Sequence, residues 1–207
     1  LSRLYDRLEI ESVKLYLSIS LKYFLLVAIP AVVGLSALAG PILDLFTTPQ
    51  FAPGAAVIPF IALSGLLAGI YQIVINITHL VKKNQFNLII HVLAAVSNLL
   101  LNLLLVPLVG FIGAAIATLI SYTITAIVAV LFSFRYIRFK IYWSPITKSV
   151  ASSGVMAGII LLLPVHSVHN LLFAVASGMV LYVMIMVLIK GLDMRELGSL
   201  KDLLISR

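Results

Sequence analysis

Amide and histidine side chains recur on one helical face near the middle of the chain. Four of them are separated by four, seven and four residues: Asn87, His91, Asn98 and Asn102. At about 100° per residue, these steps confine all four side chains to a sector of about 60°. A second set precedes it with spacings of four and three residues: Gln72, Asn76 and His79. Neutral side chains of this kind donate and accept hydrogen bonds, as sugar hydroxyls require.

The sequence offers little else that does chemistry. It has no cysteine and four histidines in no metal-ligand pattern, and no Gly-rich phosphate loop or Ser-His-Asp set occurs. We therefore expect no catalytic residue, no metal, no cofactor and no enzymatic activity. The one acidic residue in an expected membrane span is Asp44. It lies one residue from the end of that span, where we interpret it as an interfacial carboxylate.

The composition places these polar residues inside a membrane. Of 207 residues, 62% are hydrophobic and 10% are charged, with a mean hydropathy of +1.20. Soluble domains have about 45–50% apolar and about 25% charged residues, so a water-soluble globular protein is excluded. Six stretches reach the length that a helix needs to cross a bilayer: Tyr23–Leu45, Ala55–Leu80, Phe86–Val109, Phe111–Phe134, Ser149–Val165 and Leu171–Ile189. The sequence predicts an all-α polytopic membrane protein with six transmembrane helices.

The cations predict how these spans are oriented. All 14 lysines and arginines lie before the first span, after the last, or on every second connection between spans. Cytoplasmic segments accumulate Lys and Arg, so both termini are expected in the cytoplasm of a multi-pass protein of the cell membrane. The net charge of +7 is therefore a matter of topology, with membrane lipids as partners and no nucleic acid. The chain divides accordingly into a cytoplasmic connector at 1–22, four spans at 23–134, a basic cytoplasmic loop at 135–148, two further spans at 149–189 and an amphipathic cytoplasmic tail at 190–207.

Two interpretations of the intramembrane amides stay open. They either hydrogen-bond between helices, each bond contributing about 0.6 kcal/mol, or line a hydrated cavity that binds a sugar. The candidates for such a substrate cavity are Gln72, Asn76, Asn87, His91, Asn98 and Asn102. Small residues at four-residue spacing also allow close helix approach: Gly113, Ala117 and Ser121, and later Gly154 and Gly158.

The stretch 98–122 carries the most distinctive pattern. An asparagine-bearing helix ends at Pro-x-x-Gly, and the next begins with Gly-Ala-Ala-x-Ala-Thr, at Asn98, Asn102, Pro107, Gly110, Gly113, Ala114, Ala115, Ala117 and Thr118. This pattern resembles the Wzx-type polysaccharide flippases of the MOP exporter superfamily. The likeness extends to Ala28–Leu45, to Phe51–Ala56 and to the Lys82–Lys83 turn.

The resemblance implies the C-terminal portion of a two-lobe transporter whose N-terminal lobe is missing, in agreement with a chain that starts at Leu1. Residues 23–134 would belong to the second lobe and 149–189 would be peripheral. The implied function is export of a lipid-linked oligosaccharide for cell-surface polysaccharide biosynthesis, by alternating access. The alternatives are a multidrug or amphiphile exporter of the same superfamily, and an accessory subunit of a glycan-assembly enzyme. The chain departs from the family in one respect. The resemblance implies cationic residues in the cavity, where they would bind the pyrophosphate of the substrate, but no Lys or Arg lies within the expected spans of this chain.

Overall fold

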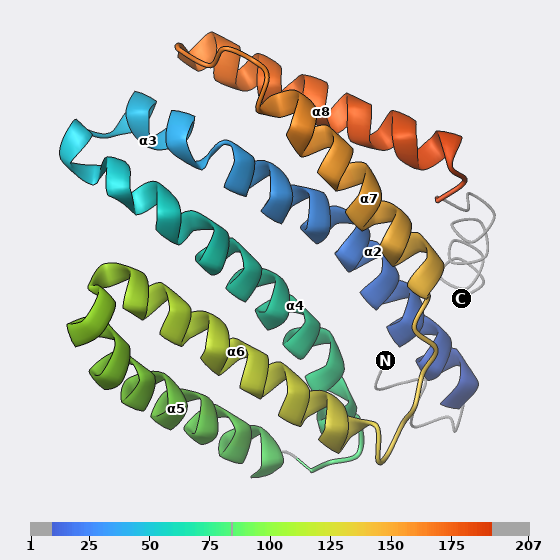
Figure 1. Cartoon of the computed structure of the whole chain (residues 1–207). Coiled ribbons are helices and arrows are strands. Elements are labelled where there is room, and N and C mark those ends of the chain that lie inside the picture. The colour runs from blue at the N-terminus through green and yellow to red at the C-terminus, as the bar shows by residue number, and fades with distance from the viewer. Residues whose placement is uncertain (1–9, 84, 192–207) are drawn as a thin grey trace.

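The computed structural model describes residues 10–83 and 85–191, which are helical throughout apart from short connections (Figure 1). The elements are α2 (Ile10–Ala37), α3 (Ala39–Phe46), the 3-10 helix η1 (Pro49–Val57), α4 (Ile58–Leu80), α5 (Gln85–Val109), α6 (Phe111–Ser133), α7 (Trp143–Ile160) and α8 (Val168–Leu188). No strand occurs within these described ranges. The predicted all-α fold is confirmed.

The six long helices pack side by side, and their order in space differs from their order in sequence. Contacts link α5 to α6, α6 to α4, α4 to α2, α2 to α7 and α7 to α8 (Figure 1). The first described helix, α2, therefore separates the group α4–α6 from the pair α7 and α8. The apolar cores follow this division, since Leu17 and Leu21 of α2 pack toward α4, whereas Leu26 packs with Met156 of α7 and Met186 of α8.

Five helical segments within the described ranges are long and apolar enough to cross a membrane, by length and composition: α2, η1 with α4, α5, α6 and α8. The chain is a multi-pass membrane protein. The exception is α7, which carries Lys148 and buries Ser149, Ser152 and Ser153 among its neighbours. Serines that face other helices make α7 less apolar than a lipid-facing helix. The predicted span at Ser149–Val165 stays a prediction, and its helix begins and ends earlier, at Trp143 and Ile160.

The helix of the first predicted span, α2, also begins earlier than predicted. It runs without a break from Ile10 to Ala37, so the second half of the expected connector at 1–22 is part of α2. Beyond Leu38 the chain continues as α3, within the expected first span, and the second span begins as η1. Residues 1–9 of the predicted connector, and the predicted amphipathic tail from residue 192 on, lie outside the described residues.

The basic segments gather at one end of the helices, called here the cationic end (Figure 1). It holds the start of α2, the α4–α5 turn, the connection from α6 to α7 and the end of α8. The opposite end holds the α3–η1 connection, the α5–α6 turn and the α7–α8 loop, which carry no Lys or Arg. This separation of charge is the one that the alternating pattern in the sequence predicts.

The α5–α6 turn shows why the Pro-x-x-Gly pattern is needed. Gly110 has a φ of +65°, a left-handed conformation that favours glycine. Just beyond it, a Cβ atom on Gly113 would lie 2.5 Å from the carbonyl oxygen of Leu105 in α5. Glycine at these two positions therefore lets the chain reverse tightly and lets the backbones of α5 and α6 come into contact.

Candidate functional site

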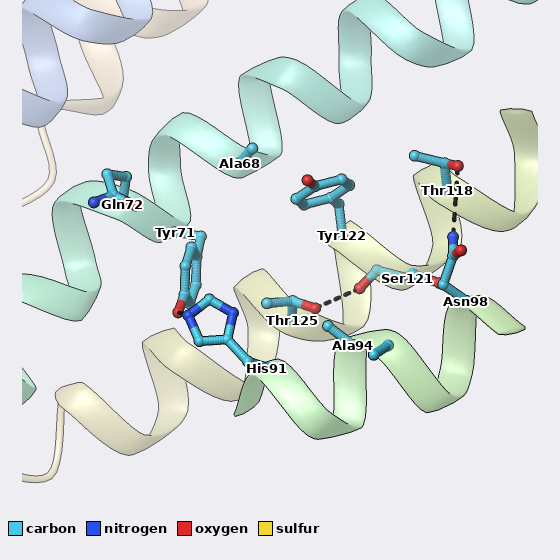
Figure 2. A pocket seen from close by; sticks show the side chains of 11 residues that line it. Ala68, Tyr71, Gln72, His91, Ala94, Asn98, Thr118, Ser121, Tyr122 and Thr125 are labelled. Carbon is cyan, nitrogen blue, oxygen red and sulfur yellow. Dashed lines mark hydrogen bonds between the residues drawn. The ribbon is translucent and has the colours of Figure 1, made fainter. Parts of the chain in front are cut away.

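A hollow of about 500 Å³ lies between α4, α5 and α6 and is called here the polar hollow (Figure 2). Its lining consists of Ala68, Tyr71 and Gln72 of α4, His91, Ala94, Ala95 and Asn98 of α5, and Thr118, Ser121, Tyr122 and Thr125 of α6. No Asp, Glu, Lys or Arg is among these eleven residues. Within the described ranges, no three His, Cys, Asp or Glu side chains cluster as metal ligands.

Each of the three helices α4, α5 and α6 contributes one face to the lining of the polar hollow. The lining residues of each helix are spaced by one, three or four positions, so they share one helical face. Ala68, Ala94 and Ala95 keep the space open because their side chains are short, and the other lining side chains are polar or aromatic (Figure 2). The site is therefore built from rigid helices and needs no loop.

Three of the six predicted cavity residues line the polar hollow: Gln72, His91 and Asn98. The imidazole Nε2 of His91 lies 3.1 Å from the hydroxyl of Tyr71, and the two rings meet edge to face at 5.6 Å between centroids. This pair joins α4 to α5 at the edge of the hollow (Figure 2). Tyr71 is 6% exposed, so the pair fixes the ring of His91 against a buried partner.

Asn98 fits both interpretations of the amides, because it lines the cavity and also forms a hydrogen bond between helices. It lines the hollow, and its side-chain amide also donates to the hydroxyl of Thr118 in α6 at 3.5 Å. Asn102, one turn further along α5, donates to the side-chain oxygen of Asn98 at 3.0 Å and to its backbone carbonyl at 2.8 Å. Asn102 thus supports Asn98 and does not itself line the hollow.

The remaining two predicted residues make contacts elsewhere. Asn76 donates its amide at 2.7 Å to the carbonyl of Gln72 in its own helix. Asn87 is buried at the start of α5, where it accepts from the hydroxyl of Thr78 and lies 3.1 Å from Nε2 of His79. Asn87 therefore joins the ends of α4 and α5 next to their turn, as the packing interpretation predicts.

Several hydroxyl-bearing residues of the hollow were missed by the sequence reasoning: Tyr71, Thr118, Ser121, Tyr122 and Thr125. Thr118, Ser121 and Thr125 have the helical spacing that would have identified a polar face on α6. Ser121 and Thr125 donate to carbonyls of their own helix, so their hydroxyl hydrogens are turned away from a ligand. Tyr122 is 38% exposed and its ring extends into the hollow (Figure 2).

A second space, of about 480 Å³, lies between α2, α7 and α8. Its lining is almost entirely apolar and includes Pro30, Gly34, Met156 and Gly178, with Tyr182 as the one residue that bears a hydroxyl. The two spaces thus lie on opposite sides of α2 in the helix order and differ in chemistry.

Lys22 lies just outside the predicted first span, but the structure places it inside α2 with 3% of its surface exposed. Its ammonium lies 5.6 Å from the ring centroid of Tyr23 and 5.3 Å from that of Tyr142. The connection from α6 to α7 folds back over α2 and also buries Ile137 and Phe139 there. The burial arises because α2 begins at Ile10, so Lys22 sits within the packed helix instead of at its entrance.

These features define a class, a polytopic helical membrane protein that holds an uncharged polar hollow among apolar helices. Residues 1–188 match the family model described as lipid II flippase MurJ. The chain belongs to this flippase family, which is part of the MOP superfamily. The likeness seen around Asn98–Tyr122 is confirmed at the level of a MOP-type flippase, and the family matched is that of MurJ, not specifically the Wzx-type polysaccharide flippases.

Two relatives come from Haloferax volcanii. The chain is 26% identical over 187 residues to "Probable low-salt glycan biosynthesis flippase Agl15", covering 88% of this chain and 39% of that protein. It is 31% identical over 160 residues to "Probable flippase AglR", covering 76% of this chain and 33% of that protein. A solved structure, "Lipid II flippase MurJ, inward closed conformation", has the same fold with a TM-score of 0.73 at 23% identity, over 89% of this chain and 40% of that one. The chain thus spans about two-fifths or less of the length of each.

Proposed function

We propose that this chain forms part of a transporter that moves a lipid-linked oligosaccharide across the cell membrane by alternating access, without covalent chemistry. The observation that carries the proposal is the polar hollow, with amides, an imidazole and phenols between apolar helices. Membership in a flippase family, and a relative named for glycan biosynthesis, support it.

The chemistry of the hollow suits a sugar. Buried polar groups are stabilised only when they are hydrogen-bonded, so a glycan leaving water requires donors and acceptors on the protein. Gln72 supplies both kinds from α4, and Asn98 supplies them from α5. Neutral side chains can replace water around hydroxyl groups without the cost of placing a fixed charge in the membrane.

The chain corresponds to less than half of the similar solved structure, so the polar hollow is proposed to act together with other parts of the protein. Because the chain spans about 40% of the similar solved structure, we propose that other segments of the protein face the hollow across the transport path. A transporter that alternates between two faces of the membrane needs such a second body to move against the first. The N-terminal lobe that the family resemblance implies would supply it.

The distribution of cations supports an orientation. We propose that the cationic end faces the cytoplasm and that both termini of this chain lie there, because cytoplasmic segments of membrane proteins are enriched in Lys and Arg. The α5–α6 turn and the α7–α8 loop would then face outward.

The test replaces one hollow residue and one matched neighbour. In the intact protein reconstituted in liposomes, Gln72→Leu should slow flipping of a fluorescent polyprenyl-diphosphate disaccharide by about tenfold. The reason is that a hydroxyl of the bound sugar loses its hydrogen-bond partner on the protein. Asn76→Leu, one turn along the same helix and outside the hollow, serves as the control and should retain the rate. Equal rates for the two variants at equal protein levels would remove the hollow from the proposal. Liposomes in which the unmodified protein moves no probe would refute the flippase itself.

A further inference from the structure

One carbonyl in α2 takes its hydrogen bond from another helix. Pro30 lies inside α2 and has no N–H, so the carbonyl of Leu26, four residues earlier, lacks the backbone donor that an α-helix normally supplies to it. The hydroxyl of Tyr182 in α8 donates to this oxygen at 2.7 Å. The hydroxyl of Ser149 in α7 lies 2.9 Å from the oxygen of Tyr182. Since Tyr182 uses its proton for Leu26, Ser149 donates to Tyr182, and the hydroxyl of Tyr182 links α2, α7 and α8.

The hydrogen bond between Tyr182 and the carbonyl of Leu26 is shielded from water. Ser149 has no exposed surface and Tyr182 is 9% exposed, so water does not replace either partner. A buried carbonyl without a donor is strongly disfavoured. A conformation that moves Tyr182 away from Leu26 must therefore find the carbonyl another partner, whereas the present conformation satisfies it.

The proline also makes this part of α2 the place where the helix can bend. Proline removes one backbone hydrogen bond and its ring crowds the preceding turn, which is why helices kink at such sites. The apolar space of about 480 Å³ borders Pro30, Gly34 and Gly178, and it leaves room beside the proline. Because α2 contacts α4 on one side and α7 on the other, a change of bend would move the group with the polar hollow relative to α7 and α8.

We propose that the segment Leu26–Pro30 is a hinge in α2 and that Tyr182, oriented by Ser149, is the latch that holds it in the present conformation. The inference rests on the proposed function, since alternating access requires at least two conformations between which the protein passes. Tyr182 is a positioning residue, because it acts on the transport path through the bend of α2. The latch opens when its hydroxyl leaves the carbonyl of Leu26.

A double-mutant cycle tests the latch directly. Spin labels on introduced cysteines at Leu63 of α4 and Val180 of α8, both exposed, report the distance across α2 in the intact protein in lipid nanodiscs. Tyr182→Phe removes only the hydroxyl and should increase a second distance population about fivefold to tenfold relative to the first. In the Pro30→Ala background, the new N–H at position 30 can satisfy Leu26, so Tyr182→Phe should change the distances little.

Two further arms keep the outcomes separate. Ser149→Ala is the milder variant, because it leaves the Tyr182 hydroxyl in place, and it should shift the populations in the same direction by a smaller factor. Unchanged distances in Tyr182→Phe, or an equal effect with and without Pro30, would overturn the latch. The distances are measured without substrate, so failure of the unmodified protein to flip the polyprenyl-diphosphate disaccharide would count against the proposed function and leave the result on the latch intact.

Discussion

Replacing Gly113 by alanine should separate α5 from α6, whereas replacing Gly158 of α7 by alanine should displace no neighbouring helix. Both glycines belong to small-residue patterns at four-residue spacing, and the sequence alone does not distinguish them. In the structure, a Cβ atom on Gly113 would lie 2.5 Å from the carbonyl oxygen and 2.6 Å from the carbonyl carbon of Leu105. A Cβ atom on Gly158 would meet nothing within 4 Å.

The magnitude follows from two opposing terms. Alanine favours a helix over glycine by about 1 kcal/mol, and this gain applies to both variants. The contact at Gly113 is with backbone atoms, which cannot rotate away, so α5 and α6 must move apart at an overpacking cost of about 1–3 kcal/mol. Because the helix-propensity gain cancels between the variants, their difference in unfolding free energy should equal the overpacking term, about 1–3 kcal/mol.

The assay is equilibrium unfolding in mixed detergent micelles, followed by the loss of helical circular dichroism, with both variants purified in parallel. Gly113→Ala should unfold at a lower denaturant concentration than the unmodified protein, and Gly158→Ala at an equal or higher one. If the two variants proved equally stable, the close backbone contact between α5 and α6 would be wrong, together with the structural role assigned to Gly113.

Two other predictions test the cationic end. Tyr142→Leu removes a ring that lies 5.3 Å from the ammonium of Lys22 and should lower the unfolding free energy by about 0.5–2 kcal/mol, whereas Tyr142→Phe keeps the aromatic face and should restore most of it. For orientation, single cysteines at Lys83 and His166 are treated with a membrane-impermeant maleimide. Cysteine at His166 should react in intact cells and cysteine at Lys83 only after lysis, and the reverse pattern would invert the proposed topology.

The sequence predicted the helical class and the gathering of the cations at one end of the helices well, because both follow from strong local signals. Lipid cannot satisfy open backbone groups, so long apolar stretches must be helical, and each basic connection reports its own side. The helix starts were less accurate. The beginning of α2 at Ile10 and of α7 at Trp143 depends on packing against neighbours, which buries Lys22 and Ser149. Hydropathy places the end of an apolar span at such polar residues, whereas in the structure they lie inside the helix.

The sequence predicted that the amide and histidine residues of α5 form one polar face. In the structure, these residues contact different partners. His91 and Asn98 line the polar hollow, Asn87 is buried against the end of α4, and Asn102 supports Asn98. Periodicity assigns residues to a face of a helix, but it does not say how far along that face each neighbour extends. The division follows from the turn between α4 and α5, which brings their ends together at Asn87, whereas His91 borders the polar hollow.

Pro30 marks the limit of what a single sequence supplies. Its missing N–H is certain from the residue type, so an unpaired carbonyl at Leu26 could have been predicted at once. The donor that satisfies this carbonyl lies 156 positions away, at Tyr182, and no local pattern connects the two. Tyrosine in an apolar helix predicts only that its hydroxyl has some partner when buried. One contact therefore satisfies both the carbonyl of Leu26 and the hydroxyl of Tyr182. The packing of α8 against α2, and not α2 alone, supplies the hydrogen bond that Pro30 removes.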